Sequence, residues 1–122
     1  MKRILIVDDH RDVAMLLHHQ LEQQEYEIEE VYNGSQALSR IFEGNFDLVL
    51  LDFDMKDIRG DRVLILARED ERLRKLPIII ITCHVELDDR MFRTYGATDV
   101  LYKPVASDDL IRIVRKCLES KG

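Results

Sequence analysis

Three carboxylates follow one strongly apolar segment closely enough to do chemistry together. The stretch LVLLDFDMKDIRG, residues 48–60, places Asp52, Asp54 and Asp57 within six residues of chain. Like charges at this spacing oppose each other's ionisation unless a positive group lies among them. A carboxylate beside a cation can serve as a metal ligand or as a nucleophile. The rest of the chain must therefore supply or bind that cation.

The elements that position these acids alternate between short aliphatic runs and longer amphipathic segments. Five runs are expected to be strands, at about residues 3–7, 27–32, 46–51, 78–81 and 100–102. Apolar residues recur at helical spacing after each run, with Ser35 and Ser107 as expected caps of the second and last helices. This alternation is typical of βαβ units around a parallel sheet. The polarity of the second run predicts an edge strand.

We therefore predict an α/β fold with a doubly wound, five-stranded parallel sheet and helices on both faces. Right-handed crossovers favour the flavodoxin-like strand order 2-1-3-4-5, in which the first and third strands are neighbours. Ligands of such sheets bind outside the carboxyl ends of the strands, where the winding reverses. If this order holds, one crevice receives the side chains that follow four strands, namely Asp8, Asp9, Asp52, Thr82 and Lys103.

The predicted crevice has the composition of a phosphoryl-transfer site. Asp8, Asp9 and Asp52 form an all-oxygen set that suits Mg²⁺ better than Zn²⁺, which favours histidine and cysteine. Lys103 adds a second positive charge, and Thr82 adds a hydroxyl donor. Asp52 is the natural nucleophile, because phosphoryl transfer asks mainly for positioning and charge neutralisation.

Along essentially its whole length, the sequence resembles the receiver domain of response regulators in two-component signalling. Four features, in order and at consistent spacing, carry the resemblance: Asp8-Asp9 after RILIV, Asp52 after LVLL with Met55 and Gly60 following, Thr82 after four isoleucines, and GATDVLYKP ending in Lys103-Pro104.

The resemblance implies one receiver domain over residues 1–122, with no output domain visible. Asp52 would accept a phosphoryl group from a histidine kinase or phosphotransfer protein, with Mg²⁺ held by Asp8, Asp9, Asp52 and the backbone of Asp54. Such a domain is a regulatory phosphoacceptor and not a turnover enzyme.

In the family, Thr82 and Lys103 would contact the phosphoryl oxygens, and the Lys103-Pro104 peptide would be cis. Phosphorylation would shift the face made by the fourth helix, fifth strand and fifth helix. A downstream protein or output domain would read that face, with a phosphorylation-dependent homodimer as a further option.

The sequence departs from the family pattern at positions that affect switching. Lys56 stands where proline is usual, Cys83 where a small residue is usual, and Val100 where an aromatic residue is usual. Tyr102 is a candidate substitute for the missing ring. With Asp54 beside the nucleophile, we expect an altered lifetime of the acyl phosphate.

Several other polar residues have simpler interpretations. Asp57 is expected to be a solvated loop acid, and the run from Arg68 to Lys75 a solvated helix face. The four histidines lack the helical spacing of a metal-binding pair, and His84 is expected in a loop close enough to the site to influence water.

Composition limits the remaining function classes. A net charge of −6 disfavours direct nucleic-acid binding, and no apolar run is long enough to span a membrane. No export signal is visible, and two isolated cysteines, Cys83 and Cys117, fit a reducing compartment. The cytoplasm is therefore the expected location.

Two alternatives remain open at this stage. FDLVLLDFD also resembles the motif of haloacid-dehalogenase-type phosphatases, in which Asp52 would be the nucleophile and Asp54 the acid/base. A degenerate receiver that only binds partners is the other alternative. Phosphatase turnover would favour the first, and loss of Mg²⁺ affinity the second.

Overall fold

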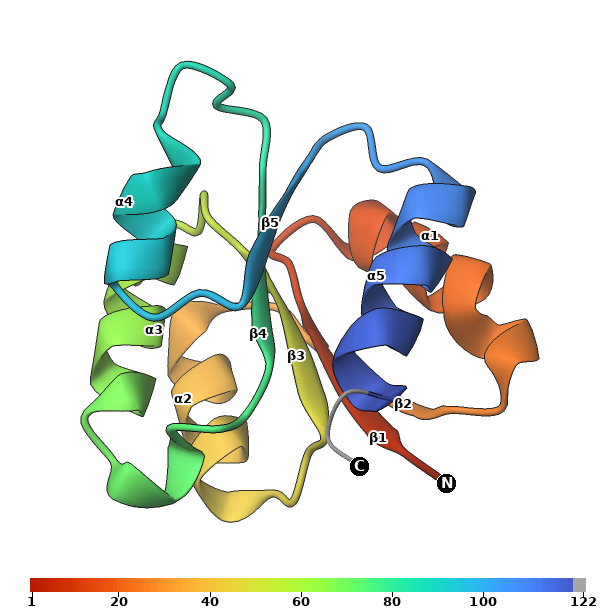
Figure 1. Cartoon of the computed structure of the whole chain (residues 1–122), viewed down its shortest axis with the longest axis horizontal. Coiled ribbons are helices and arrows are strands. Elements are labelled where there is room, and N and C mark those ends of the chain that lie inside the picture. Colours follow the sequence, from red (N-terminus) through yellow and green to blue (C-terminus); the bar gives the residue numbers. More distant parts are fainter. Residues whose placement is uncertain (120–122) are drawn as a thin grey trace.

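A computed structural model describes residues 1–119 of the chain, and within that range the predicted fold is confirmed (Figure 1). All strands are parallel, in the order β2-β1-β3-β4-β5. The strands are β1 (Arg3–Val7), β2 (Glu27–Val31), β3 (Leu48–Asp52), β4 (Ile78–Thr82) and β5 (Asp99–Tyr102). The α-helices are α1 (Arg11–Leu21), α2 (Gly34–Glu43), α3 (Gly60–Arg68), α4 (Asp89–Thr94) and α5 (Ser107–Glu119), and short 3₁₀ turns cover Glu22–Gln24 and Glu71–Leu73.

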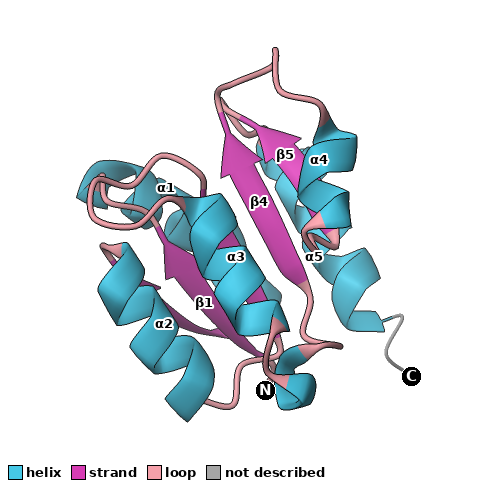
Figure 2. Ribbon diagram, turned by 90° about the vertical axis from the view of Figure 1, so that its left-hand side faces the viewer, coloured by secondary structure: helices cyan, strands magenta, loops and turns pink. Residues whose placement is uncertain are grey.

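Each face of the sheet is covered by its own helices and has its own apolar core. Helices α2, α3 and α4 cover one face, and α1 and α5 cover the other (Figure 1). Figure 2 views the first of these layers from outside, with the strands running behind α2 and α3. Every residue of β3 and β4 is buried. The central strands are thus buried on both faces of the sheet, as their continuous aliphatic runs predict.

The parallel register aligns the carboxyl ends of neighbouring strands. Val7 of β1 lies opposite Leu51 of β3, and Asp52 lies opposite Ile81 of β4. Thr82 in turn lies opposite Tyr102 of β5. Residues that follow or end these strands therefore emerge at one edge of the sheet.

One local expectation at the start of α2 is wrong. Asn33, and not Ser35, caps the helix, because its side chain accepts a hydrogen bond from the backbone N–H of Gln36 at 2.8 Å. Asp57 is an exposed loop acid, as expected, and its carboxylate also accepts hydrogen bonds from the backbone N–H groups of Gly34 and Ser35 at 2.8 and 3.0 Å. These bonds lower the pKa of Asp57 and tie the loop after β3 to α2.

The run from Arg68 to Lys75 is also not one helix face. Helix α3 ends at Arg68, and a 3₁₀ turn covers Glu71–Leu73. The half-buried Arg68 guanidinium donates hydrogen bonds to the carbonyl oxygens of Gly96, at 2.9 Å, and Leu73. Gly96 has φ +112°, which favours glycine, and the bond to its carbonyl anchors the turn that follows α4.

Candidate functional site

Asp8, Asp52 and Lys103, which we call the acid–lysine cluster, meet at the carboxyl edge of the sheet. The Lys103 ammonium nitrogen lies 3.0 Å from Asp8 Oδ2 and 3.0 Å from Asp52 Oδ1. The two carboxylate side chains are only 1% and 2% exposed, so this pairing takes place out of water. The structure therefore brings together Asp8, Asp52 and Lys103, from the ends of β1, β3 and β5, as predicted.

Burial and charge shift the ionisation of this cluster. Burial of the Asp52 carboxyl, followed by the charge of Asp8, raises the pKa of Asp52 to about 6, although Lys103 acts in the opposite direction. For Lys103, burial lowers the pKa, but its bonds to Asp52 and Asp8 outweigh that effect and raise it overall. One ammonium group thus compensates two buried carboxylates only in part, and a second cation would be stabilised here.

Two buried oxygens are candidate ligands for that cation. Within residues 1–119, Asp52 Oδ2 and Asp9 Oδ1 are buried and make no hydrogen bond, although His10 Nδ1 lies 3.1 Å from the Asp9 oxygen. Buried carboxylate oxygens without partners are costly unless they coordinate a metal. Together with Asp8, they make an oxygen donor set that fits Mg²⁺. Candidate ligand atoms of Asp8, Asp9 and His10 also lie within 4.8 Å of one another.

Thr82 lies beside this cluster and is fully buried. Its hydroxyl oxygen accepts a hydrogen bond from the backbone N–H of His84 at 3.0 Å, and its carbonyl accepts one from the backbone N–H of Lys103 at 2.8 Å. The backbone N–H of Phe53 bonds the carbonyl of Ile81 at 2.9 Å. The strand ends that carry Asp52, Thr82 and Lys103 are therefore held together through the backbone.

Gly60 explains why the loop after β3 can close over Asp52. Its backbone N–H donates to the carbonyl of Phe53 at 2.8 Å. A Cβ at this position would lie 2.2 Å from the Asp52 carbonyl oxygen and 2.8 Å from Phe53 Cα. Because these are backbone atoms, a side chain at position 60 would displace the residue that we predict as nucleophile.

The Asp54 side chain is directed differently from the other predicted site residues. It is exposed, and its Oδ2 lies 2.7 Å from His84 Nε2 and 3.8 Å from Cys83 Sγ. Sequence reasoning missed this pairing, because it joins two loops whose shapes periodicity does not determine. Hydrogen bonds to Glu86 and then to Asp54 raise the pKa of His84.

Two of the residues expected to matter for switching, Val100 and Tyr102, lie on β5. Val100 is buried in the core that α2, α3 and α4 cover. Tyr102 is 36% exposed and is the register partner of Thr82. In a parallel pair, register partners point to the same side of the sheet, so the Tyr102 and Thr82 side chains leave their strands on the same side. The Lys103-Pro104 peptide is cis, as expected.

Comparisons with known proteins agree with this geometry. The family model described as "Response regulator receiver domain" matches residues 4–115. The chain belongs to this receiver-domain family. The "Response regulator ArlR" of Staphylococcus saprophyticus is 32% identical over 119 residues, which are 97% of this chain and 53% of that protein. The chain thus spans about half the length of the curated relatives it matches.

Solved structures give the same result for the receiver domain. A CheY-like response regulator receiver domain protein from Methanospirillum hungatei is 29% identical, with a TM-score of 0.90 over 100% of this chain and 99% of that one. The response regulator protein TrrA from Thermotoga maritima, solved in complex with Mg²⁺-BeF, is 35% identical, with a TM-score of 0.87 over 97% of this chain and 100% of that one. This chain is a receiver domain of two-component signalling.

Membership in this family favours a signalling role over the phosphatase alternative. None of the helices described within residues 1–119 is long and apolar enough to cross a membrane.

Proposed function

We propose that Asp52 is the phosphoacceptor of this receiver domain. The observation that carries the proposal is the state of its carboxylate: Oδ1 is paired with Lys103 at 3.0 Å, while Oδ2 is buried without a hydrogen-bond partner in residues 1–119. A carboxylate in that state can present one oxygen to phosphorus and the other to a cation. The raised pKa of Asp52 is compatible with a nucleophile that is ionised when a cation is near.

The transfer uses the neighbouring side chains in distinct roles. Asp52 forms a new O–P bond as the P–N bond of a phosphohistidine breaks, and the released imidazole of the donor takes up a proton. Lys103 holds one oxygen of Asp52 and neutralises charge, and the Thr82 hydroxyl lies at the end of the next strand to donate to a phosphoryl oxygen. The site residues of this proposal are thus Asp52, Thr82 and Lys103.

Asp8, Asp9, Asp52 and the backbone of Asp54 would hold Mg²⁺ in this scheme. The unpartnered oxygens of Asp52 and Asp9 support the first part of that set. When bound, Mg²⁺ supplies positive charge that offsets the repulsion between the carboxylates and the incoming phosphoryl group. Lys103 alone offsets that repulsion incompletely.

An intact-mass measurement tests the proposal. Incubation with Mg²⁺ and a small phosphodonor such as acetyl phosphate should add the mass of one phosphoryl group to the chain, and Asp52→Asn should abolish this gain. Asp57→Asn is the matched control, since Asp57 is a carboxylate of the same loop that bonds the backbone of Gly34 and Ser35. Persistence of the mass gain in Asp52→Asn would show that another residue is the phosphoacceptor.

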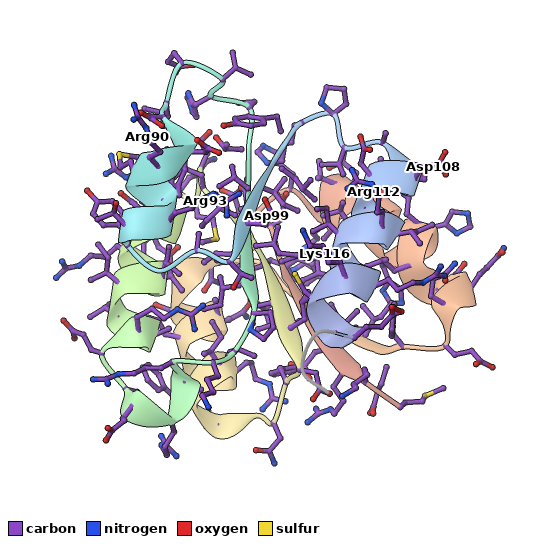
Figure 3. The ribbon with its side chains drawn as sticks, viewed as in Figure 1. Arg90, Arg93, Asp99, Asp108, Arg112 and Lys116 are labelled. Carbon is purple, nitrogen blue, oxygen red and sulfur yellow. The ribbon has the colours of Figure 1, made fainter. Side chains whose placement is uncertain are left out.

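We further propose that α4, β5 and α5 form the surface that partners read. Figure 3 shows Arg90 and Arg93 on α4, Asp99 on β5, and Asp108, Arg112 and Lys116 along α5. Arg93 pairs with Asp99 at 2.8 Å, and this surface carries charges of both signs. Such a pattern suits a downstream protein, an output domain or a second copy of the chain.

Sedimentation velocity with Mg²⁺ and beryllofluoride would test the homodimer option. A shift from monomer to dimer that Arg112→Glu suppresses would support self-association. A monomer under both conditions would leave a different protein or an output domain as the reader.

We also propose one receiver domain over residues 1–122, a histidine kinase or phosphotransfer protein as donor, a regulatory role without turnover, and a cytoplasmic location.

A further inference from the structure

A second group of metal-binding side chains lies outside the acid–lysine cluster. Asp54, in the loop after β3, and Cys83 and His84, in the loop after β4, form what we call the rim cluster. These loops leave the same edge of the sheet near α4 (Figure 1). One ligand atom from each side chain lies within 4.8 Å of the other two. The cluster thus brings a carboxylate, a thiol and an imidazole together from two loops.

The ligand types and spacing suit Zn²⁺ and not Mg²⁺. Cysteine sulfur and histidine nitrogen are the ligands that Zn²⁺ favours, whereas Mg²⁺ favours oxygen. Tetrahedral coordination at ordinary Zn²⁺ bond lengths separates neighbouring ligand atoms by about 3.4 to 3.6 Å. The observed Asp54 Oδ2 distances, 2.7 Å to His84 Nε2 and 3.8 Å to Cys83 Sγ, bracket that range. Small side-chain shifts would therefore admit the ion.

His84 has a further feature of a metal ligand. Its other ring nitrogen, Nδ1, lies 2.9 Å from Glu86 Oε2, so a carboxylate stands behind the imidazole. Metal-binding histidines commonly donate that second N–H to a carboxylate, which fixes the tautomer and leaves Nε2 to bind the ion. The ring also packs edge-on against Phe53, with centroids 5.5 Å apart. Its orientation toward Asp54 is thus held by two contacts.

Exposure makes the rim cluster accessible to an ion. The Asp54 side chain is 48% exposed and the His84 side chain 35%, and Cys83 is exposed as well. A bound ion would keep water in its remaining coordination position. Cys83 would bind as the thiolate, so binding releases its proton to the solvent.

We propose that Asp54, Cys83 and His84 form a Zn²⁺ site that clamps the loops after β3 and β4 together. If the proposed function is correct, the site also regulates phosphorylation. The backbone N–H of His84 bonds the Thr82 hydroxyl at 3.0 Å, so a clamp on His84 holds that hydroxyl in its present position. A hydroxyl held in this way is less free to turn toward a phosphoryl oxygen, so Zn²⁺ at the rim would slow the transfer.

Titration of the full chain with Co²⁺, under reducing conditions, tests the site directly. We expect visible bands of tetrahedral Co²⁺ and a near-ultraviolet thiolate-to-cobalt charge-transfer band, both removed by one equivalent of Zn²⁺ and retained in excess Mg²⁺. Cys83→Ala should abolish the charge-transfer band. His84→Gln should weaken Co²⁺ binding by at least tenfold, and Glu86→Gln by roughly 10- to 100-fold if it orients the ring.

Two control variants separate this site from other ligands in the chain. Cys117→Ala removes the other cysteine, on α5, and should retain the band. His10→Gln removes the histidine near Asp8 and Asp9 and should also retain it. Absence of the band in the unmodified chain, its persistence in Cys83→Ala, or its loss in His10→Gln would overturn the proposal.

The regulatory part has a separate readout. One equivalent of Zn²⁺ should slow the mass gain from a phosphodonor in the unmodified chain and leave the rate in Cys83→Ala unchanged. Equal slowing of both chains would refute the clamp while leaving metal binding at the rim intact. No mass gain in either chain, with normal Co²⁺ spectra, would contradict the proposed function and not the site.

Discussion

The acid–lysine cluster and the rim cluster lie at the same edge of the sheet but in opposite surroundings. Asp8 and Asp52 have side chains 1% and 2% exposed, whereas the Asp54 side chain is 48% exposed. Both clusters combine carboxylates with a basic group at hydrogen-bond distance. In the buried cluster a carboxylate oxygen remains without a partner, while in the exposed cluster the carboxylate bonds His84.

This difference shows that burial, more than the identity of the side chains, determines what a carboxylate can do. Desolvation raises the pKa of Asp52 to about 6 and makes its charge depend on nearby cations. Asp54, two residues later, is screened by water. Substitutions that remove charge should therefore have large effects on stability in the buried cluster and small effects at the rim.

The largest expected effect comes from removing the buried cation. Lys103→Met leaves Asp8 and Asp52 buried without their counter-charge, so the free energy of unfolding should fall by about 3 kcal/mol. Urea titration without divalent cations measures this change. Lys56→Met is the control, because Lys56 is exposed in the loop after β3. A similar loss of unfolding free energy in the two variants would show that burial of the lysine does not determine the effect.

A smaller effect of opposite sign is expected for Asp52→Asn. The native pKa of Asp52, about 6, lies above the ordinary aspartate value of 3.8, so the folded state binds more protons between these values. Stability therefore falls as the pH rises from about 4 to 6, and the loss is complete above that window. The variant should gain about 1 to 2 kcal/mol at pH 7, and little at about pH 4, in urea titrations without Mg²⁺.

The same titrations with Asp54→Asn provide the comparison at the rim. Its change in unfolding free energy should stay below about 0.5 kcal/mol, as for most exposed substitutions. A stability gain in Asp54→Asn equal to that in Asp52→Asn would contradict the role assigned to burial.

Mg²⁺ should stabilise the folded chain by a comparable or smaller amount. At ten times its dissociation constant, a ligand that binds only the folded state adds about 1.4 kcal/mol. We expect that gain in the unmodified chain and a clear reduction in Asp9→Asn, which loses one of the unpartnered oxygens. Thermal unfolding with and without Mg²⁺ measures it. An undiminished gain in Asp9→Asn would place the ion elsewhere.

The smallest effect concerns ionisation at the rim. Hydrogen bonds to Glu86 and, next, to Asp54 raise the pKa of His84, so Glu86→Gln should lower it more than Asp54→Asn does. NMR titration of the imidazole resonances, without added metal, measures both changes, with the His19 signal as an internal reference. If neither variant changed the pKa of His84, these hydrogen bonds would not be the reason that it is raised.

The sheet and most of the proposed site followed from the sequence because both depend on periodicity. Aliphatic runs fixed the strands, and parallel topology then brought Asp52 and Lys103 to one edge. The missed features are side-chain bonds between loops. The bonds from Asp57 to the start of α2 and from His84 to Asp54 depend on loop backbone shapes that no spacing encodes.

The bond between Arg68 and the Gly96 carbonyl has a mechanical consequence for α4. It restrains the turn after the helix, and the fully buried Phe92 adds a second contact at that end. The amino-terminal end of α4 comes directly after the loop that carries Cys83 and His84 of the rim cluster. Any rearrangement that keeps this pivot must be a swing of the amino-terminal end. Six residues of helix are about 9 Å long, so a tilt of α4 by about 10° about its carboxyl-terminal end would displace Asp89 by about 1.5 Å.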